Sequence, residues 1–550
     1  MTSAWSGSSS TISTCALSGA WGSWMIWSLV TWMSASGSVI HCRRAWIPAE
    51  TGGRWPIESQ SMAPEHLTNP GRAGGQPRFG PTRVHLVGAG GSGMSGLAMM
   101  LKARGFEVSG SDSRDGPELA PLRGAGIEVT TEDAAPLPEG CSMVIHSAAI
   151  PPEHPELRSA RRDELEVLSY AEALGRLQST RSGISIAGTH GKSTTSGLLA
   201  HVLVEGGLDP DVIVGANCGQ IGGGWRLGAE QVPGRGPLAG SPGLMICEAC
   251  EFNRSFHHHQ PRIALINNVE EDHLDIYEGI EEIIEAFRVF ARSLPPAREG
   301  GFLLIAHEGA HRLQVASGLD CKVETFGFSP GADWTFELHD GTVGLSDPDG
   351  VEVASWRMSM PGPHNAANSV AAAVLARRVG ADWDDIERAI EGFEGLDRRT
   401  QHLGSRELGD GGRVEVVDDY GHHPSEIELT LRALRESFDP RRIICVFQPH
   451  QHSRTRFLLE QFASSFELAD LVIVPEIYFV RDSETERHKV SASDLVDRLN
   501  TKGTTAQHLH PFETIVDRLE EVCRDGDLLV SMGAGPVWEV THAFLGEAGR

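Results

Sequence analysis

One stretch of the chain, residues 184–195, constrains the fold more than any other. A short β-branched run is followed by Gly188-Thr-His-Gly191, then by Lys192 and three hydroxyl residues, and a helix is expected over residues 197–204. The order strand, glycine loop, helix is typical of loops that hold a triphosphate, because backbone N–H groups and the helix N-terminus face the anion. The usual spacing would put a glycine at Ile186, so this is a shorter form of the loop. A glycine turn with a solvated lysine is the alternative. The predicted nucleotide contacts are Gly188, Thr189, His190, Gly191, Lys192, Ser193 and Thr194.

A second glycine loop lies upstream. A strand expected at residues 83–87 runs into Gly88-Ala-Gly-Gly-Ser-Gly93, a helix over 94–104 follows, and a strand over 107–112 ends in Asp112. This is the dinucleotide-binding pattern, in which glycines admit a pyrophosphate and the acid accepts from a ribose hydroxyl. NAD and a nucleotide-sugar both carry a pyrophosphate, so both remain open. The candidate contacts are Gly88, Gly90, Gly91, Gly93, Asp112 and, after a strand at 143–147, Ser147.

Polar residues also follow later strands of the central region. A strand expected at 244–247 leads to Glu248 and Glu251, and one at 263–266 leads to His273. A carboxylate beside a phosphate loop is where Mg²⁺ needs a ligand. A lone histidine is more often structural, but beside these groups His273 becomes a candidate ligand. The predicted metal ligands are therefore Ser193, Thr194, Glu248 and His273.

Three other features of this region allow alternatives. Asn365 precedes a helix expected over residues 369–379, and its side chain either caps that helix or faces a base or sugar. Cys247 and Cys250 with the histidines at 257–259 could bind zinc, although no second cysteine pair follows. Residues 219–243 are rich in glycine and too poor in apolar residues for a core element, so we expect a mobile surface loop.

A third region begins near residue 396 with Arg398 and Arg399, a pair suited to bidentate phosphate contact. Polar residues then follow two strands expected at 414–417 and 441–447. Open parallel sheets bind ligands at the carboxyl ends of their strands, which makes solvation alone an unsatisfactory explanation of this clustering. The candidates after the two strands are Asp418, His422, His423, His450 and Arg454.

Composition limits the classes of partner and compartment. A formal charge of −27 argues against nucleic-acid or anionic membrane surfaces. The nine cysteines are odd in number and scattered, which indicates a reducing cytoplasm. Residues 1–80 differ from the rest: seven of the twelve tryptophans precede residue 56, and no charged residue precedes Arg43. A signal or anchor is one interpretation. We favour disorder or a true start at Met62, and expect no stable membrane insertion.

The motifs together resemble the Mur ligases of peptidoglycan synthesis. The resemblance runs in order from about residue 83 to 534, and its downstream motifs are Glu248-Ala-x-Glu251, Asp272-His-x-Asp275, His364-Asn-x-x-Asn368, Asp418-Asp-Tyr-Gly-His-His-Pro424 and Gln448-Pro-His-x-x-Ser-Arg-Thr455. It departs from the family at Cys250, where aspartate is usual, at Gln451-His452, where Arg-Tyr is usual, and at Pro536, where aspartate is common.

The resemblance implies three α/β domains, each with a mainly parallel sheet: residues 81–182 for a UDP-sugar, 183–395 for ATP and 396–550 for the amino acid, with 1–80 unmatched. It implies ATP-dependent joining of L-alanine to UDP-N-acetylmuramate through an acyl phosphate, with Mg²⁺. A ligase that recycles murein peptides and a nicotinamide-dependent oxidoreductase are the alternatives. The implied roles are catalysis by Lys192, His273 and Arg399, ATP contacts from Asn365, Arg398 and Asp418, and amino-acid or lactyl contacts from His422, His423, His450 and Arg454. The sequence does not predict an oligomeric state.

Overall fold

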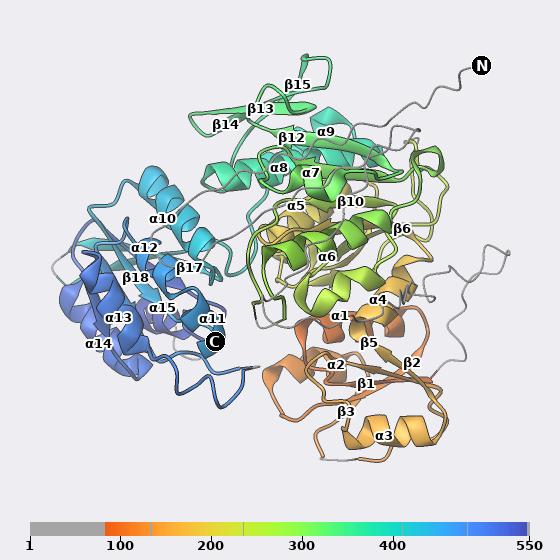
Figure 1. Cartoon of the computed structure of the whole chain (residues 1–550), viewed down its shortest axis with the longest axis horizontal. Coiled ribbons are helices and arrows are strands. Elements are labelled where there is room, and N and C mark those ends of the chain that lie inside the picture. Colours follow the sequence, from red (N-terminus) through yellow and green to blue (C-terminus); the bar gives the residue numbers. More distant parts are fainter. Residues whose placement is uncertain are drawn as a thin grey trace, which may run out of the picture. The chain divides into compact units, whose positions relative to one another are not determined.

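The computed structural model describes residues 83–546 except 133–134, 235, 275, 410 and 481, and without the side chains of Ser92 and Pro117. The expectations for residues 1–80, including a start at Met62, and the motif residue Asp275 lie outside the described residues. The described residues belong to one compact unit, residues 75–550. They form three sheets in the order of the chain (Figure 1), which we call the N-terminal, central and C-terminal domains. The expected α/β architecture is confirmed, and we propose the boundaries 81–182, 183–395 and 396–550.

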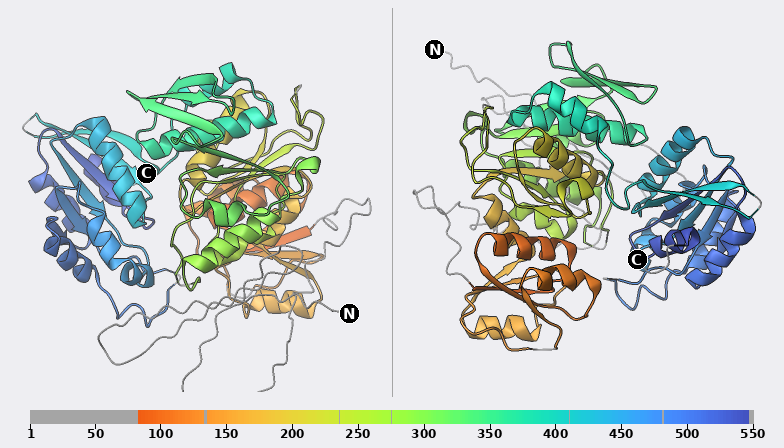
Figure 2. Two further views of the ribbon diagram at one scale, coloured as in Figure 1. Left: turned by 45° about the horizontal axis from the view of Figure 1, so that its top comes forward. Right: turned by 180° about the vertical axis from the view of Figure 1, so that it is seen from behind.

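The N-terminal domain is a parallel sheet with the order β3-β2-β1-β4-β5. Alternate residues of β1 face opposite sides: Leu86 packs with helices α1, α2 and α4, whereas Val87 packs with Leu157 of α3. Figure 2 shows α3 on the opposite side of this sheet from α1. Because both faces are covered, the central strands β1 and β4 carry buried apolar residues on both sides. The elements are β1 (Arg83–Val87), α1 (Ser92–Ala103), β2 (Glu107–Ser111), α2 (Ala120–Gly124), β3 (Glu128–Thr130), β4 (Met143–His146), α3 (Pro155–Arg162), β5 (Glu166–Ser169) and α4 (Tyr170–Gln178).

The central domain has a ten-stranded sheet with the order β15-β14-β13-β12-β11-β10-β6-β9-β7-β8. It is parallel from β13 to β7, and β14, β15 and β8 add antiparallel strands at its edges. Helices α5, α8 and α9 cover one face and α6 the other. The strands are β6 (Ser182–Ala187), β7 (Asp211–Ile213), β8 (Trp225–Arg226), β9 (Leu244–Glu248), β10 (Ile263–Ile266), β11 (Phe302–Ala306), β12 (Lys322–Gly327), β13 (Trp334–His339), β14 (Thr342–Ser346) and β15 (Glu352–Arg357). The helices are α5 (Lys192–Glu205), α6 (Ile280–Arg292), α7 (Arg312–Ala316), α8 (Pro363–Val379) and α9 (Trp383–Glu391).

The glycine-rich residues 219–243 are part of the core, so the prediction that they lack a core element is wrong. Ile221, Val232 and Leu238 are buried in the cluster that contains α5 and α8. Trp225 forms β8 and packs against Gly96 of α1, where an added Cβ would lie 3.2 Å from the Trp225 Cβ. Apolar residues are sparse in this stretch, but Ile221, Val232 and Leu238 are buried in the core. The composition of residues 219–243 as a whole therefore did not show that a few of its residues are buried.

One glycine contact joins the N-terminal and central domains closely. Gly175 of α4 faces the 3-10 helix η3 (Phe252–His258), and a Cβ added there would lie 1.9 Å from the backbone oxygen of His258. No side-chain rotation relieves a clash with backbone. We expect Gly175→Ala to lower the free energy of unfolding by at least about 1–3 kcal/mol, because the two segments must separate.

Gly124 provides a matched control for this prediction. It lies in helix α2 with no atom within 4 Å of an added Cβ. Alanine favours helix over glycine by up to about 1 kcal/mol, so Gly124→Ala should unfold at or slightly above the wild-type temperature. Thermal denaturation of both variants checks the pair, and equal midpoints would contradict the close packing at Gly175.

The C-terminal domain is a six-stranded sheet with the order β16-β17-β21-β18-β19-β20, parallel except for β16. Helices α10, α12 and α13 cover one face, and α14 and α15 cover the other (Figure 1). The strands are β16 (Gln401–Glu407), β17 (Arg413–Asp419), β18 (Arg442–Phe447), β19 (Leu471–Val474), β20 (Ala506–His508) and β21 (Asp527–Met532). The helices are α10 (Pro424–Phe438), α11 (His452–Phe457), α12 (Leu459–Ser464), α13 (Ala492–Thr501), α14 (Phe512–Val522) and α15 (Trp538–Leu545).

Candidate active site

The predicted phosphate loop connects β6 to α5. Gly191, immediately before α5, has φ of +79°, and a Cβ there would lie 2.6 Å from Asn368 Oδ1 and 2.8 Å from Asn267 Nδ2. Only glycine fits this backbone and this space. The loop is also fixed by hydrogen bonds, because His190 N donates to Asn268 Oδ1 at 2.7 Å. These contacts define the shape of the loop.

Lys192 is held inside this loop. Its Nζ donates to the carbonyl oxygens of Gly188 at 2.6 Å and Thr189 at 3.0 Å, and lies 2.9 Å from Glu251 Oε2. Burial alone would lower the pKa of Lys192, but the charge of Glu251 outweighs burial and raises it. The lysine is therefore a fixed positive charge beside the loop.

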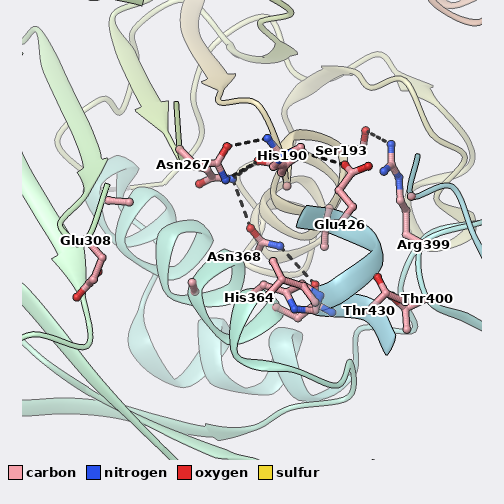
Figure 3. Close-up of a pocket in the computed structure, with 18 of the residues that line it drawn as sticks. His190, Ser193, Asn267, Glu308, His364, Asn368, Arg399, Thr400, Glu426 and Thr430 are labelled. Atoms are coloured by element: carbon pink, nitrogen blue, oxygen red, sulfur yellow. Dashed lines mark hydrogen bonds and ion pairs between the residues drawn. The ribbon is translucent and has the colours of Figure 1, made fainter. Parts of the chain in front are cut away.

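A pocket opens next to this loop, between the central and C-terminal domains (Figure 3). One wall contains His190, Ser193 and residues at the start of α8, and the facing wall contains Arg399, Thr400 and Glu426. The lining also includes the aromatic residues Phe326, Phe328 and Phe336, with Glu308 beside them. Polar groups next to a phosphate loop, together with aromatic side chains, suit a phosphate chain joined to a planar base. The predicted residues that line the pocket are His190, Gly191, Ser193, Thr194, Asn365 and Arg399.

The two arginines at 398 and 399 have different surroundings. Arg399 Nη2 donates to Ser193 Oγ at 3.3 Å, so it crosses from the C-terminal domain to the phosphate loop. Arg398 instead pairs with Asp418 at 3.0 Å and donates to the backbone oxygens of Gly533 and Gly535. Asp418 is 1% exposed, and its neighbour Asp419 lines the pocket. Arg398 and Asp418 are not among the residues that line this pocket, so their expected direct contact with ATP stays a prediction.

A cross-domain cluster surrounds His190. Its Nδ1 lies 3.1 Å from Glu426 Oε1, its Nε2 lies 3.6 Å from Glu270 Oε2, and its ring centroid is 4.8 Å from that of His423. Glu270 also accepts from Ser425 Oγ at 2.8 Å. His190 and Glu270 belong to the central domain. The other three residues, His423, Ser425 and Glu426, lie at the start of α10 in the C-terminal domain. The cluster therefore joins the phosphate loop to the C-terminal domain.

The charge of His190 makes this junction sensitive to pH. Burial alone would lower the pKa of His190, but Glu426 and Glu270 outweigh it and raise the pKa to about 10. A histidine in an unfolded chain titrates near about 6.5. The stabilisation from His190 is therefore complete below pH of about 6.5 and is lost as the pH rises through about 10.

We expect His190→Gln to lower the unfolding temperature most at pH of about 6 and least near pH of about 10, because the wild type loses its positive charge over this window. Thermal denaturation across the window measures the difference. His339, an exposed histidine 3.2 Å from Glu337, is the control, and His339→Gln should change little at any pH. A His190→Gln difference that is independent of pH would contradict the ion pair.

A second cross-domain contact lies behind Lys192. Arg454 of α11 donates to Asp272 Oδ1 at 2.7 Å from Nη2 and 3.1 Å from Nε, and its Nη2 is 3.2 Å from His273 Nδ1. His273 has φ of +54°, an uncommon backbone conformation for a histidine. Burial lowers the pKa of His273, and this favours the neutral imidazole.

One of the expected metal ligands, His273, lies in a cluster with Glu251 and Asp272, which were not predicted as ligands. The ligand atoms of Glu251, Asp272 and His273 lie within 4.8 Å of one another. Glu248 instead accepts from the backbone N–H of Gly215 at 2.7 Å. Carboxylates and hydroxyls are the ligands that Mg²⁺ prefers, so the donors around Lys192 fit this ion. In the part of the chain that the structure describes, no metal-capable cluster contains Cys247 or Cys250, which gives the zinc alternative no support.

The histidines expected to contact the amino acid divide into two groups. His422 and His450 have ring centroids 5.7 Å apart, and His450 Nδ1 lies 3.4 Å from Arg454 Nη1, so these three converge. Burial lowers the pKa of His422 to about 4. His423 turns towards the central domain, where its Nε2 lies 3.0 Å from the backbone oxygen of Glu271.

The upstream glycine loop lies at the carboxyl ends of β1 and β2. Asp112 Oδ2 accepts from the backbone N–H of Gly90 at 2.8 Å, and the Ser147 Cβ lies 3.1 Å from where a Gly88 Cβ would be. A Cβ on Gly93 would lie 2.7 Å from the hydroxyl of Tyr170. The candidates Gly88, Gly90, Gly91, Gly93, Asp112 and Ser147 thus surround the ends of three adjacent strands.

Sequence reasoning missed several residues that the structure brings to the pocket. Asp419 was not predicted because it is adjacent to Asp418, and only the alternation of side chains along the strand distinguishes the two. Asp419 lies on the same face as Val417, which packs against α10. Glu426 had a local signal, since it forms a capping box with His423 at the start of α10. The aromatic residues at 326, 328 and 336 had none, because they are far in sequence from the loop.

The three departures from the family pattern lie near these sites. Cys250 adjoins Glu251, and burial raises the pKa of its thiol to about 11. Gln451 N donates to the Tyr478 backbone oxygen at 3.1 Å, while the His452 ring meets that of Phe479 at 5.8 Å. Pro536 accepts from Glu539 N at 3.0 Å. None of the three disrupts the contacts of Lys192 described above.

A phosphate loop with a buried lysine, a pocket completed by a second α/β domain and a separate pyrophosphate-type loop define a multidomain nucleotide-binding α/β protein. Family descriptions match the chain in three consecutive segments: the Mur ligase family catalytic domain at residues 83–181, the Mur ligase middle domain at 186–376 and the Mur ligase glutamate ligase domain at 398–535. The chain belongs to the Mur ligase family, which confirms the resemblance seen in the sequence.

Individual relatives support this assignment. The chain is 34% identical over 471 residues to the UDP-N-acetylmuramate–L-alanine ligase of Caldanaerobacter subterraneus, covering 84% of this chain and 97% of that protein. It is 35% identical over 468 residues to the same ligase of Clostridium novyi, covering 84% and 97%. The solved UDP-N-acetylmuramate–alanine ligase of Thermotoga maritima shares the fold, with 23% identity, a TM-score of 0.67, and coverage of 85% of this chain and 99% of that one. These findings give no support to the oxidoreductase alternative.

Proposed function

We propose that this protein joins L-alanine to UDP-N-acetylmuramate, forming UDP-N-acetylmuramoyl-L-alanine, ADP and phosphate from ATP during cytoplasmic peptidoglycan synthesis. The relatives at 34–35% identity carry the name of this ligase. The observation that carries the proposal is the contact between Arg454, Asp272 and His273, which brings the expected amino-acid site beside the buried lysine of the phosphate loop.

Each ligand has a separate set of proposed contacts. The UDP pyrophosphate lies on the loop from Gly88 to Gly93, with Asp112 and Ser147 at its edge. The triphosphate lies along residues 188–194, Arg399 closes over it, and the base lies beside the aromatic residues of the pocket. His422, His450 and Arg454 hold the alanine carboxylate or the muramoyl lactyl group. Arg398 and Asp418 are the remaining predicted ATP contacts, and His423 joins the domains.

The reaction requires activation of a carboxylate, which is a poor electrophile at neutral pH. A carboxylate oxygen of the muramate attacks the γ-phosphorus of ATP, the bond from this phosphorus to ADP breaks, and an acyl phosphate forms. The first step brings two anions together, so the fixed charge of Lys192 and the approach of Arg399 lower its barrier. The alanine amine, having lost a proton, then attacks the acyl carbon, and phosphate leaves with the electrons of the carbon–oxygen bond.

Magnesium completes the proposed site. Ser193, Thr194, Glu248 and the cluster of Glu251, Asp272 and His273 are the groups that would hold it. When bound, Mg²⁺ supplies additional positive charge to the phosphate oxygens. Neutral His273 offers a nitrogen ligand, and Arg454 fixes the position of its ring.

Phosphate release tests the proposed reaction directly. We expect release from ATP only when UDP-N-acetylmuramate and L-alanine are both present, with glycine and L-serine as less effective acceptors. Phosphate release in the absence of an acceptor amino acid would contradict the proposal. So would a lack of phosphate release when ATP, UDP-N-acetylmuramate and L-alanine are all present. Replacing L-alanine by a murein tripeptide separates the recycling alternative, in which the tripeptide would be the better acceptor.

The proposal requires small-molecule partners and no nucleic acid. It also requires no insertion into a membrane, and none of the described helices is long and apolar enough to cross one. All seven cysteines among the described residues are free, which supports a reducing compartment.

A further inference from the structure

A group of metal-capable side chains lies at the edge of the C-terminal sheet. Glu476 follows β19, His508 is the last residue of β20 and His510 comes two residues later. Because β19 and β20 are parallel neighbours, with Val474 opposite His508, these side chains meet at the same edge of the sheet. None of them belongs to the sites described above.

The spacing of their ligand atoms is that of a coordination site. Glu476 Oε1 lies 3.5 Å from His508 Nε2 and 3.6 Å from His510 Nε2, and the three ligand atoms lie within 4.8 Å of one another. A tetrahedral zinc ion with bonds of about 2.0–2.1 Å holds its ligand atoms about 3.3–3.4 Å apart. The two distances from Glu476 already match this spacing closely, and the two histidine nitrogens lie within 4.8 Å of each other.

His508 is oriented for binding through Nε2. Its Nδ1 lies 3.0 Å from Ser493 Oγ, and when the ring donates from Nδ1 to this hydroxyl, its lone pair lies on Nε2. The Nε2 atom is buried and makes no hydrogen bond to any described residue, although Glu476 is 3.5 Å away. A hydrogen bond from the second ring nitrogen is how metal-binding histidines are usually held. The buried Nε2, which makes no hydrogen bond to a described residue, is the second observation that points to a metal ligand.

We propose that Glu476, His508 and His510 bind one first-row divalent transition-metal ion of the zinc type, with a fourth position for water. Two imidazole nitrogens and one carboxylate oxygen favour such an ion over Mg²⁺ or Ca²⁺, which prefer oxygen ligands. The site is independent of the proposed function.

Bound metal would brace a segment next to the candidate amino-acid site. The backbone oxygen of Glu476 accepts from Gln448 Nε2 at 3.2 Å, and Tyr478 N donates to the Pro449 oxygen at 2.8 Å. Gln448 and Pro449 immediately precede His450 in the chain. The metal thus stiffens the loop that holds this histidine.

Equilibrium dialysis of the full chain against Zn²⁺, with excess Mg²⁺ to occupy oxygen-rich sites, tests the proposal. We expect the wild type to bind one more equivalent than His510→Ala or Glu476→Gln, whose replaced side chains are 58% and 62% exposed and do not endanger folding. Ser493→Ala should keep the site but weaken it about 10–100-fold, as loss of an orienting hydrogen bond does. His339→Ala, which alters an exposed histidine beside a single glutamate, should bind as the wild type does.

Equal stoichiometry in the wild type, His510→Ala and Glu476→Gln would overturn the proposal, and so would loss of the same equivalent in His339→Ala. Co²⁺ gives a second measurement, since a tetrahedral site produces an intense visible absorption that these two ligand variants should lose. A Co²⁺ spectrum unchanged by both substitutions would also overturn it.

Discussion

Replacing Lys192 by alanine should reduce turnover by about 10²-fold or more while leaving binding of UDP-N-acetylmuramate nearly unchanged, because one strong charge contact to the reacting phosphates is lost. The UDP-sugar candidates are all in the N-terminal domain, whereas the Lys192 ammonium contacts its own loop and Glu251 in the central domain. Phosphate release measures turnover, and calorimetry measures binding of the UDP-sugar. Near-normal turnover would contradict the assignment of the phosphate loop.

The same substitution has a structural consequence that needs its own control. Glu251 is 2% exposed, and removal of Lys192 leaves its charge buried without this partner, at a cost of about 3–5 kcal/mol. Adding Glu251→Gln to Lys192→Ala removes that charge, so thermal denaturation should show recovered stability while turnover stays low. Recovered turnover in the double variant would mean that the loss was structural. Lys322→Ala removes a 53% exposed lysine, and its buried partner Glu324 keeps a hydrogen bond from Trp334 Nε1, so this control should change neither quantity appreciably.

Replacing Arg454 by methionine should both destabilise the protein and lower kcat/KM for L-alanine. The ion pair with Asp272 is buried on both sides, at 7% and 9% side-chain exposure, so breaking it should cost about 3–5 kcal/mol. Displacement of His273 and His450, which Arg454 contacts, should lower kcat/KM by about 10²-fold, as small misplacements of reacting groups do. Thermal denaturation and steady-state kinetics measure the two effects.

Arg456, two residues along the same helix, is the matched control. It pairs with Glu486 at 2.9 Å nearer the surface, so Arg456→Met should cost less than about 1 kcal/mol and leave kcat/KM within about twofold. Equal effects of the two substitutions would show that the position of Arg454 between the domains has no special importance.

The pH dependence of the Arg454 variant gives an independent check. Burial alone would raise the pKa of Asp272, but the charge of Arg454 outweighs it and lowers the pKa in the wild type. The stability from this pair is present above about pH 3.9, the pKa of an unfolded aspartate, and is lost as the pH falls through the lower folded value. Without Arg454, burial raises the pKa of Asp272, so acidification neutralises the unpaired carboxylate. The deficit of Arg454→Met should therefore be smaller at pH of about 5 than at pH of about 7.

The elements around the glycine loops could be predicted because their signals are local. The strand before Gly88, the strand before Gly188 and the helix after Lys192 each follow from an apolar run, a glycine turn and a helical sequence within about a dozen residues. The burial of residues within 219–243 could not be predicted, because it depends on contacts with a strand edge and a helix that are distant in the sequence. The roles expected for individual site residues stay predictions until the substitutions above are made.

The amino-acid sequence by itself determined the order of the motifs, the three α/β domains and the membership in the Mur ligase family. Each of these follows from local patterns and from the order in which the patterns occur along the chain. Only the tertiary structure separated neighbouring residues: Arg399 reaches the phosphate loop and Asp419 lines the pocket, whereas Arg398 and Asp418 pair with each other. Asp418 and Asp419 are adjacent on β17 and point to opposite sides of the strand, so the packing of helices on each face decides which one meets the pocket. Arg398 instead lies in a turn with φ of +59°, so strand alternation does not separate it from Arg399. The junctions from His190 to Glu426 and from Asp272 to Arg454 likewise join residues 236 and 182 positions apart, and no local signal in the chain indicates such contacts.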